Sequence, residues 1–137
     1  MMKRILGMGV ALLVALGVGW VWGASGKSDI SRALQLAELR DGLLEGRAAV
    51  LDARLDIYSV NFGEASRHLE MARSALRAAD ARLNDLGRQE EATQLKIALA
   101  RIDEAQRAAG QLSQNANSQA ADAARTINEV LGSIAKR

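Results

Sequence analysis

The sequence predicts an all-α protein, in which an N-terminal transmembrane helix is followed by an antiparallel, four-helix, up-and-down bundle with heptad-like packing. Three observations lead to this fold class. The chain contains no proline and few aromatic residues, which suits long uninterrupted helices better than β-strands. Residues 5–23 carry no charge. After residue 30, apolar residues recur at alternating steps of four and three, the spacing of helices that pack at shallow angles.

The uncharged segment Ile5–Gly23 is long enough to cross a bilayer. Its nineteen residues would rise about 28 Å as a helix, close to the thickness of the hydrocarbon core. The basic residues Lys3 and Arg4 precede it, so the positive-inside rule places the N-terminus in the cytoplasm. Trp20 and Trp22 lie at its outer end, where indole rings favour the headgroup level.

These features divide the chain into four parts. We expect residues 1–4 to form a cytoplasmic flank, 5–23 a signal-anchor, 24–29 a short linker, and 30–137 an exocytoplasmic bundle. The expected location is the bacterial inner membrane, with the bulk of the chain in the periplasm. The alternative is a secretory signal that is cleaved near the small residues at 23–26, which would release the bundle into the periplasm.

A row of small residues follows one face of the predicted span. Its members recur every four residues: Gly7, Ala11, Ala15, Gly19 and Gly23. Such a row lets two helix backbones approach closely in lipid. Self-association, or docking onto another membrane protein, is therefore expected here, although chance in an Ala- and Gly-rich segment explains the row equally well.

The charge balance excludes a nucleic-acid-binding reading. The chain has 18 Lys and Arg against 16 Asp and Glu, and once Lys3 and Arg4 are assigned to the anchor the remainder is neutral. The absence of cysteine excludes disulfides and thiol catalysis.

The heptad pattern runs from Ile30 to Phe62 and continues to Leu86, and it predicts the core of the bundle. It is interrupted at Asp41, which we expect either to be exposed beside Gly42 or to fix the register against an arginine of another helix. The predicted core residues are Leu34, Leu44, Leu51, Leu55, Tyr58, Phe62, Leu69, Leu76, Leu83, Leu95, Leu99, Ile102, Leu112, Ile127, Val130 and Ile134.

Three glycine-bearing sites predict the turns between four helices. They are Asn61–Gly63, Gly87 as a helix C′ residue, and Gly110 together with the polar run 113–118. Because the heptad pattern crosses Asn61–Gly63 without a phase slip, a second arrangement remains open. In it, the first two helices fuse into one rod that packs only as an oligomer.

Residues 48–80 resemble a single tetratricopeptide-type helical hairpin. The piece Asn61-Phe62-Gly63-Glu64-Ala65, followed by Leu69 and Ala72, is similar to the start of the second helix of that repeat. The resemblance covers one repeat, lacks its terminal proline, and implies peptide or protein binding.

No constellation of catalytic residues is found in the sequence. His68 is the single histidine, and with Glu64 four residues earlier it is expected to form a solvated pair rather than a metal site. The neighbouring pair Glu90 and Glu91 is expected to serve the helix dipole and solubility. We therefore expect no catalytic residue, no metal and no cofactor.

The sequence favours a non-enzymatic, membrane-anchored scaffold, adaptor or accessory subunit of a cell-envelope complex, acting by protein–protein binding. One alternative is a coiled-coil homo-oligomer that serves as an envelope spacer or as the inner-membrane component of a lysis device. A second alternative is an exported helical ligand-binding domain.

Overall fold

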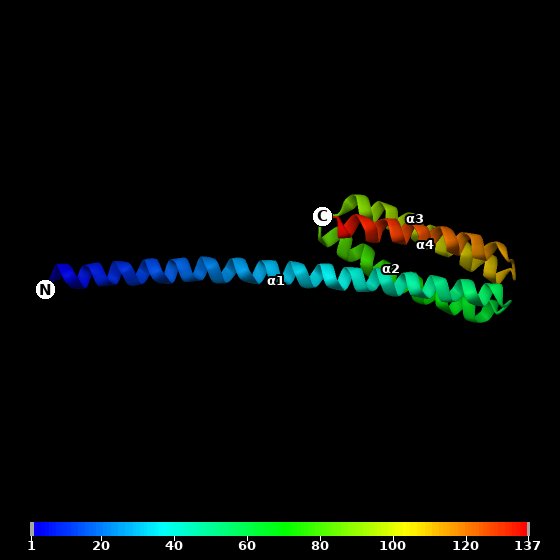
Figure 1. Ribbon diagram of the computed structural model, residues 1–137, viewed down its shortest axis with the longest axis horizontal. Helices are drawn as coiled ribbons and strands as arrows, with labels where there is room; N and C mark the ends of the chain where they lie inside the picture. The colour runs from blue at the N-terminus through cyan, green and yellow to red at the C-terminus, as the bar shows by residue number, and fades with distance from the viewer. Residues whose placement is uncertain (1, 137) are drawn as a thin grey trace. The chain divides into compact units, whose positions relative to one another are not determined.

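The computed structural model describes the backbone of residues 2–136 and the side chains of residues 29–136. In this part of the chain the protein is all-α, with four helices and no strand. The helices are α1 (Met2–Tyr58), α2 (Phe62–Asp85), α3 (Gln89–Gly110) and α4 (Asn115–Ala135) (Figure 1). The chain falls into two compact units, Met1–Leu36 and Ala37–Arg137. The second unit contains the end of α1 and the three shorter helices.

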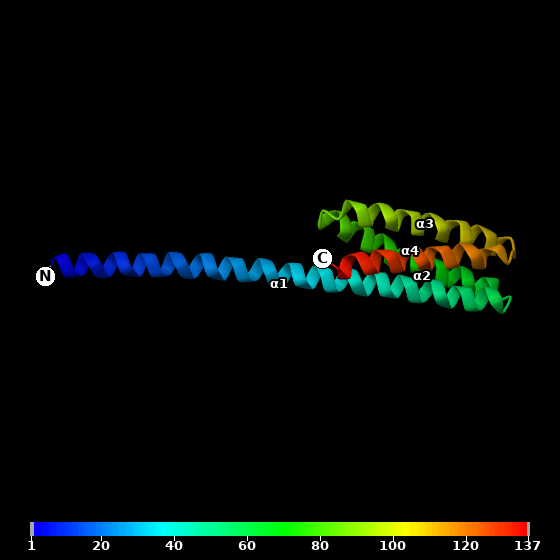
Figure 2. The same ribbon diagram turned by 45° about the horizontal axis from the view of Figure 1, so that its top comes forward.

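Within the second unit the four helical segments form an antiparallel bundle (Figures 1 and 2). Helix α1 meets α2 at Glu38–Arg82 near one end and at Asp56–His68 near the other. Helix α2 meets α3 through Arg73 and Asp103, and Gln106 donates a hydrogen bond to the carbonyl of Ser66. In each pair of helices, residues with higher numbers in one helix contact residues with lower numbers in the other. The two helices of each pair are therefore antiparallel.

Helix α4 closes the bundle by packing against both α3 and α1. Arg101 of α3 donates a hydrogen bond to Gln119 of α4, at 3.2 Å. Arg54 of α1 donates a hydrogen bond to Asn117, at 2.9 Å, and Gln114 donates one to the carbonyl of Ile57, at 3.1 Å. The helices therefore run up, down, up and down, with α1 beside both α2 and α4.

Each helix buries one row of apolar residues at heptad spacing, and the rows meet in a single core. Alanine and leucine dominate this core, so some layers bring backbones close together while others are filled by branched side chains. The buried apolar residues on α1 are Leu39, Leu43, Ala49, Val50, Ala53 and Ile57. On α2 they are Phe62, Ala65, Leu69, Ala72, Leu76, Ala79 and Leu83. On α3 and α4 they include Leu95, Ile102, Ile127 and Val130, with Leu99 and Ile134 partly buried against them.

Gly46 of α1 is buried and lies against Leu76 of α2. A Cβ atom built on Gly46 would lie 2.5 Å from Cδ2 and 2.7 Å from Cγ of Leu76. Leu76 is fully buried, so its side chain would have to shift within the core to admit this Cβ atom. One turn earlier, a Cβ atom on Gly42 would meet only ordinary contacts, at 3.9 Å or more. Glycine is thus needed sterically at position 46 and not at position 42.

All three turns of the bundle have the same backbone geometry, the Schellman motif. The motif places one residue after the helix in a left-handed conformation and bonds two backbone N–H groups to the last carbonyls of the helix. After α2 this residue is Gly87, with φ 71°; Gly87 N–H donates to Asn84 and Arg88 N–H to Leu83. The prediction of a C′ glycine at Gly87 is confirmed.

The other two turns use bulky residues where the motif favours glycine. Val60 has φ 62°, with Val60 N–H donating to Ile57 and Asn61 N–H to Asp56. Leu112 has φ 55°, with Leu112 N–H donating to Ala109 and Ser113 N–H to Ala108. The turns predicted at Asn61–Gly63 and at Gly110 with 113–118 overlap the observed ones, but they are centred a few residues too late or too broadly, and both glycines lie within helices.

The α1–α2 turn also contradicts the alternative of one fused rod, since α1 ends at Tyr58 and α2 returns along it. The continuous heptad pattern has another cause, because two helices in a hairpin can share a period across a short turn. Residues 24–29, expected to be a linker, lie within α1. The boundary between the two compact units falls after Leu36.

Five of the predicted core residues are exposed instead, and four of them lie on α1. Leu34, Leu44, Leu55 and Tyr58 are 59%, 42%, 68% and 80% exposed, and Leu112 in the α3–α4 turn is 71% exposed. The physical reason is that α1 carries two apolar rows with the same period. The row through Leu39, Leu43 and Ile57 faces the core. The predicted row lies on the opposite face, and only Leu51 of its large side chains is partly buried.

No helix among the residues with described side chains is long and apolar enough to cross a bilayer. The predicted span Ile5–Gly23, its row of small residues, Trp20, Trp22, Lys3 and Arg4 all lie outside the residues whose side chains are described. The transmembrane helix therefore remains a prediction.

Candidate functional site

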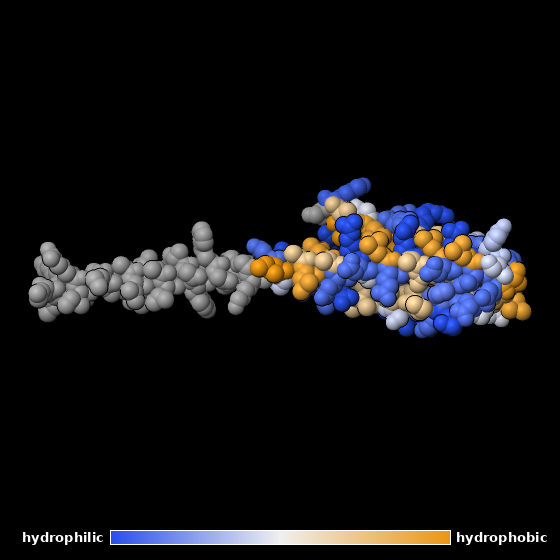
Figure 3. All heavy atoms as spheres, turned by 60° about the horizontal axis from the view of Figure 1, so that its bottom comes forward, coloured by the Kyte–Doolittle hydropathy of each residue, from blue (hydrophilic) through white to orange (hydrophobic). Residues whose placement is uncertain are grey.

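Among the described residues, α1 carries more exposed large apolar side chains than any other helix. Leu44, Leu55 and Tyr58 are exposed large side chains at heptad spacing, and Leu51 lies between them. Ala37 and Ala48 complete the row and are also exposed. We call these six residues the outer stripe. Figure 3 shows apolar surface along this face of the bundle, between hydrophilic side chains.

The outer stripe ends in a hollow between α1 and α4. The hollow has a volume of about 310 Å³ and is lined by Leu51, Arg54, Leu55, Tyr58 and Asn117. The Arg54–Asn117 hydrogen bond holds its polar edge in place. Because its lining is mainly apolar with polar groups at the rim, the hollow suits an apolar side chain from a partner.

Two further exposed apolar side chains lie in the turns at this end of the bundle. They are Val60, which is 67% exposed, and Leu112. The two turns are held together by Gln114, which donates a hydrogen bond to the carbonyl of Ile57. Each left-handed non-glycine residue costs about 1–2 kcal/mol, so this end of the bundle exposes bulky apolar groups at the expense of stability.

Among the described residues, the ion pairs either lie within one helical segment or join two neighbouring helices. His68 lies 2.7 Å from Asp56 of α1, while Glu64 pairs with Arg67. The prediction of a solvated Glu64–His68 pair is therefore wrong, because Asp56 on the neighbouring helix reaches the imidazole first. Among residues 29–136, no three His, Asp or Glu side chains gather as metal ligands.

Glu91 is the one buried charged side chain among the described residues, with 1% exposure. It lies in the first turn of α3, where the helix dipole favours an anion. Arg88 lies 3.3 Å from its carboxylate, and Ser133 of α4 donates a hydrogen bond to it at 3.0 Å. Glu91 thus fastens α3 to α4 instead of serving solubility, whereas Glu90 is exposed.

Arg73 joins α2 to α3 by pairing with Glu70 on its own helix and with Asp103 on the next. The hydrogen bond from Arg73 lowers the pKa of Glu70, and the same bond raises the pKa of Arg73. Both side chains lie at the surface, so the pair stabilises the bundle only weakly.

Two other surface hollows have a different character from the outer stripe. One, of about 530 Å³, is lined by Gln94, Glu129, Gly132, Ser133 and Lys136, all polar or small. The other, of about 450 Å³, contains one large apolar side chain, Ile97, among polar and small neighbours on α3. Neither continues into an apolar row.

Asp41, singled out because it interrupts the predicted heptad pattern, lies at the surface of α1. Gly42 beside it continues the helix without a break. The sequence pattern found the residues of the outer stripe but assigned them to the core. One sequence signal could have separated the two rows: Asp41 is a charge in the outer row, whereas the inner row from Leu39 to Ile57 has none.

The chain was compared with protein-family models, curated proteins and solved structures, and none of the three comparisons finds a match.

Proposed function

We propose that this chain is a non-enzymatic, membrane-anchored scaffold or adaptor subunit of a cell-envelope complex, and that it binds a helix of a partner protein along the outer stripe. The observation that carries the proposal is the exposure of Leu44, Leu55 and Tyr58 in one heptad row. A helical partner is recognised through apolar side chains at such spacing, because they lie on one face and interdigitate with a matching row.

The position of the row supports this proposal. Isolated exposed apolar residues are common, whereas a continuous apolar patch rimmed by polar groups marks an interaction surface. The outer stripe lies opposite the face that α1 buries in the bundle, so a partner could cover it without disturbing the core.

The membrane part of the proposal rests on the sequence. The uncharged run Ile5–Gly23, preceded by Lys3 and Arg4, supports a single-pass anchor with its N-terminus in the cytoplasm and the bundle in the periplasm. The row from Gly7 to Gly23 supports a second contact within the bilayer.

Site-specific photo-crosslinking in intact membranes tests the proposal. A photoreactive phenylalanine analogue is placed at Leu51, Leu55 or Tyr58 of the full chain. Met71 on α2 and Ile97 on α3 are the matched controls, since both are exposed large apolar residues off the stripe. We expect protein adducts from the stripe positions and none from the controls. Equal labelling at all positions, or none anywhere, would contradict the proposal.

A further inference from the structure

The outer stripe is flanked on each side by charges of one sign. Basic residues precede Ala48 and Leu55 of the stripe, and Asp41, which interrupts it: Arg47, Arg54 and Arg40. Acidic residues follow Ala37, Leu44 and Leu51 of the stripe: Glu38, Glu45 and Asp52. In heptad notation the outer stripe occupies positions a and d, the arginines occupy g, and the acids occupy e.

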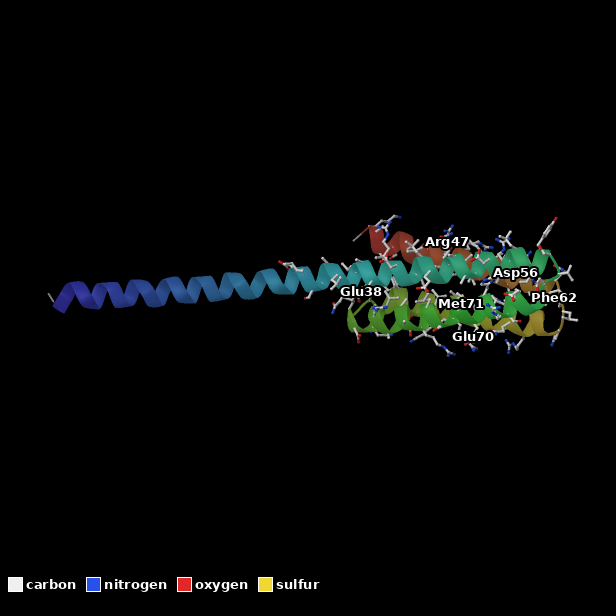
Figure 4. All side chains as sticks on the ribbon, turned by 90° about the horizontal axis from the view of Figure 1, so that it is seen from below. Glu38, Arg47, Asp56, Phe62, Glu70 and Met71 are labelled. Atoms are coloured by element: carbon white, nitrogen blue, oxygen red, sulfur yellow. The ribbon has the colours of Figure 1, made fainter. Side chains whose placement is uncertain are left out.

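The structure places these two charged rows on opposite sides of α1. Arg54 reaches Asn117 of α4, whereas Glu38 pairs with Arg82 of α2. Figure 4 likewise shows Arg47 on the α4 side of α1 and Glu38 on the α2 side. The outer stripe therefore has a basic margin and an acidic margin.

The central charges of both margins are not used inside the bundle. Among the described residues, no ion pair or hydrogen bond engages the side chains of Arg40, Glu45 or Asp52, all of which are exposed. The Nε of Arg47 is buried and lacks a hydrogen-bond partner within the described part of the chain. These charges are available to a partner.

Building on the proposed function, we propose that the helix that covers the outer stripe is α1 of a second copy of this chain, lying parallel to the first. In a parallel pair, a g residue faces the e residue of the next heptad on the other helix. Arg40 then meets Glu45 of the second copy, and Arg47 meets its Asp52. Twofold symmetry doubles both pairs.

The opposite orientation is disfavoured by the same charges. In an antiparallel pair, g faces g and e faces e. Arginine would then meet arginine along one margin, and carboxylate would meet carboxylate along the other. Like charges in such positions repel, so the margins specify direction as well as partner.

In the parallel pair Asp41 faces Asp41 of the second copy across the seam, so this position needs a counter-charge. Asp41 occupies an a position. In a parallel pair, the g residue just before the matching a position of the second copy lies beside it. That residue is Arg40 of the second copy, so the acidic interruption of the stripe gains a counter-charge. A polar residue at a single a position commonly fixes register at some cost in affinity.

The interface is small, so membrane anchoring matters for it. The stripe from Ala37 to Tyr58 is about 33 Å long at 1.5 Å per residue, or three heptads. Such a contact is weak between free chains, but attachment to one membrane raises the effective concentration of the partners. Chains anchored by their N-termini in the same membrane also emerge parallel.

The experiment uses the full chain in membrane vesicles and exploits its lack of cysteine. Ala48→Cys places one thiol at an a position, and Ala78→Cys, at an exposed site on α2, is the control. Mild oxidation should give a disulfide dimer from the first variant and little from the second. If the two variants dimerise equally, parallel pairing through the stripe is overturned.

Charge reversal provides the specific readout in the Ala48→Cys background. We expect Arg40→Glu with Arg47→Glu to lower self-association about ten-fold or more, since four attractive pairs become repulsive. Glu45→Lys with Asp52→Lys should do the same. A mixture of the two differently tagged variants should recover dimer, because each acidic margin then faces a basic one.

The outcomes separate this inference from the function on which it rests. Self-association of either reversed variant at the wild-type level overturns the parallel pair. The parallel pair is also overturned if the mixture dimerises while the wild type does not, because that result is expected of an antiparallel pair. Photo-adducts of the stripe that contain only other proteins also overturn the parallel pair but leave the docking function standing. If no stripe position gives an adduct, both the parallel pair and the docking function are contradicted.

Discussion

At the scale of single residues, the turns show where this chain gives up stability. The same Schellman geometry is built with Gly87 at one end of the bundle, and with Val60 and Leu112 at the other. A side chain with Cβ is disfavoured in the left-handed region because Cβ approaches the following carbonyl oxygen. The bundle folds with two such residues because each turn keeps both of its capping hydrogen bonds.

Replacing these residues should change stability in opposite directions at the two ends. We expect Val60→Gly and Leu112→Gly each to raise the free energy of unfolding by about 1 kcal/mol, because strain is removed. Gly87→Ala should lower it by a similar amount. Denaturant unfolding followed by circular dichroism measures all three. A Val60→Gly variant less stable than the wild type would show that packing of the valine outweighs its strain.

At the scale of secondary-structure elements, the approach of α1 to α2 depends on the size of one residue. A side chain at position 46 collides with Leu76, whereas one at position 42 does not. Overpacking in a filled core typically costs about 1–3 kcal/mol. An alanine in place of a glycine within a helix otherwise gains about 1 kcal/mol.

Gly46→Ala and Gly42→Ala therefore form a matched pair one turn apart on the same helix. We expect Gly46→Ala to destabilise the bundle by up to about 2 kcal/mol, and Gly42→Ala to be neutral or stabilising. Thermal unfolding should give Gly46→Ala a lower midpoint than the wild type, and Gly42→Ala a midpoint equal to or above it. Equal effects would mean that Leu76 can move aside.

The all-α class and the four helical segments of the bundle could be predicted from the sequence, because heptad spacing, the absence of proline and Gly87 all constrain them. The face of α1 could not be predicted. Its rows through Leu43 and Leu44 are both apolar with the same period, and periodicity does not say which one turns inward. The two remaining turns were displaced by a few residues because Val60 and Leu112 occupy positions where glycine is expected.

Long-range polar pairs were also beyond prediction. That Glu91 is acidic and begins a helix is visible in the sequence, but its burial depends on Ser133, which lies 42 residues away. The pairing of His68 with Asp56 likewise depends on the hairpin between α1 and α2. Helical spacing in the sequence pointed only to Glu64 as the partner of His68. In the fold, the carboxylate of Asp56 pairs with His68 instead.

At the scale of the whole molecule, the unit Ala37–Arg137 holds the complete core of the bundle. All eight residues from Asp29 to Leu36 are exposed or only partly buried. We expect chains that begin at Asp29 and at Ala37 to unfold cooperatively, with midpoints within about 4 °C of each other. Differential scanning calorimetry decides this. A much lower midpoint for the shorter chain would show that residues 29–36 support the fold.

The two rows of α1 have a consequence for how this protein can change over evolutionary time. Packing in the core restricts substitution at the inner positions, and contact with Leu76 restricts it at Gly46. The proposed second copy restricts substitution at the outer positions and in both charged margins. Almost no position from Leu39 to Ile57 is left free to drift. No such contact with a second copy is proposed for the outer face of α3. Among descendants of this sequence, α1 should therefore diverge most slowly, and its changes should come in compensating pairs of opposite charge.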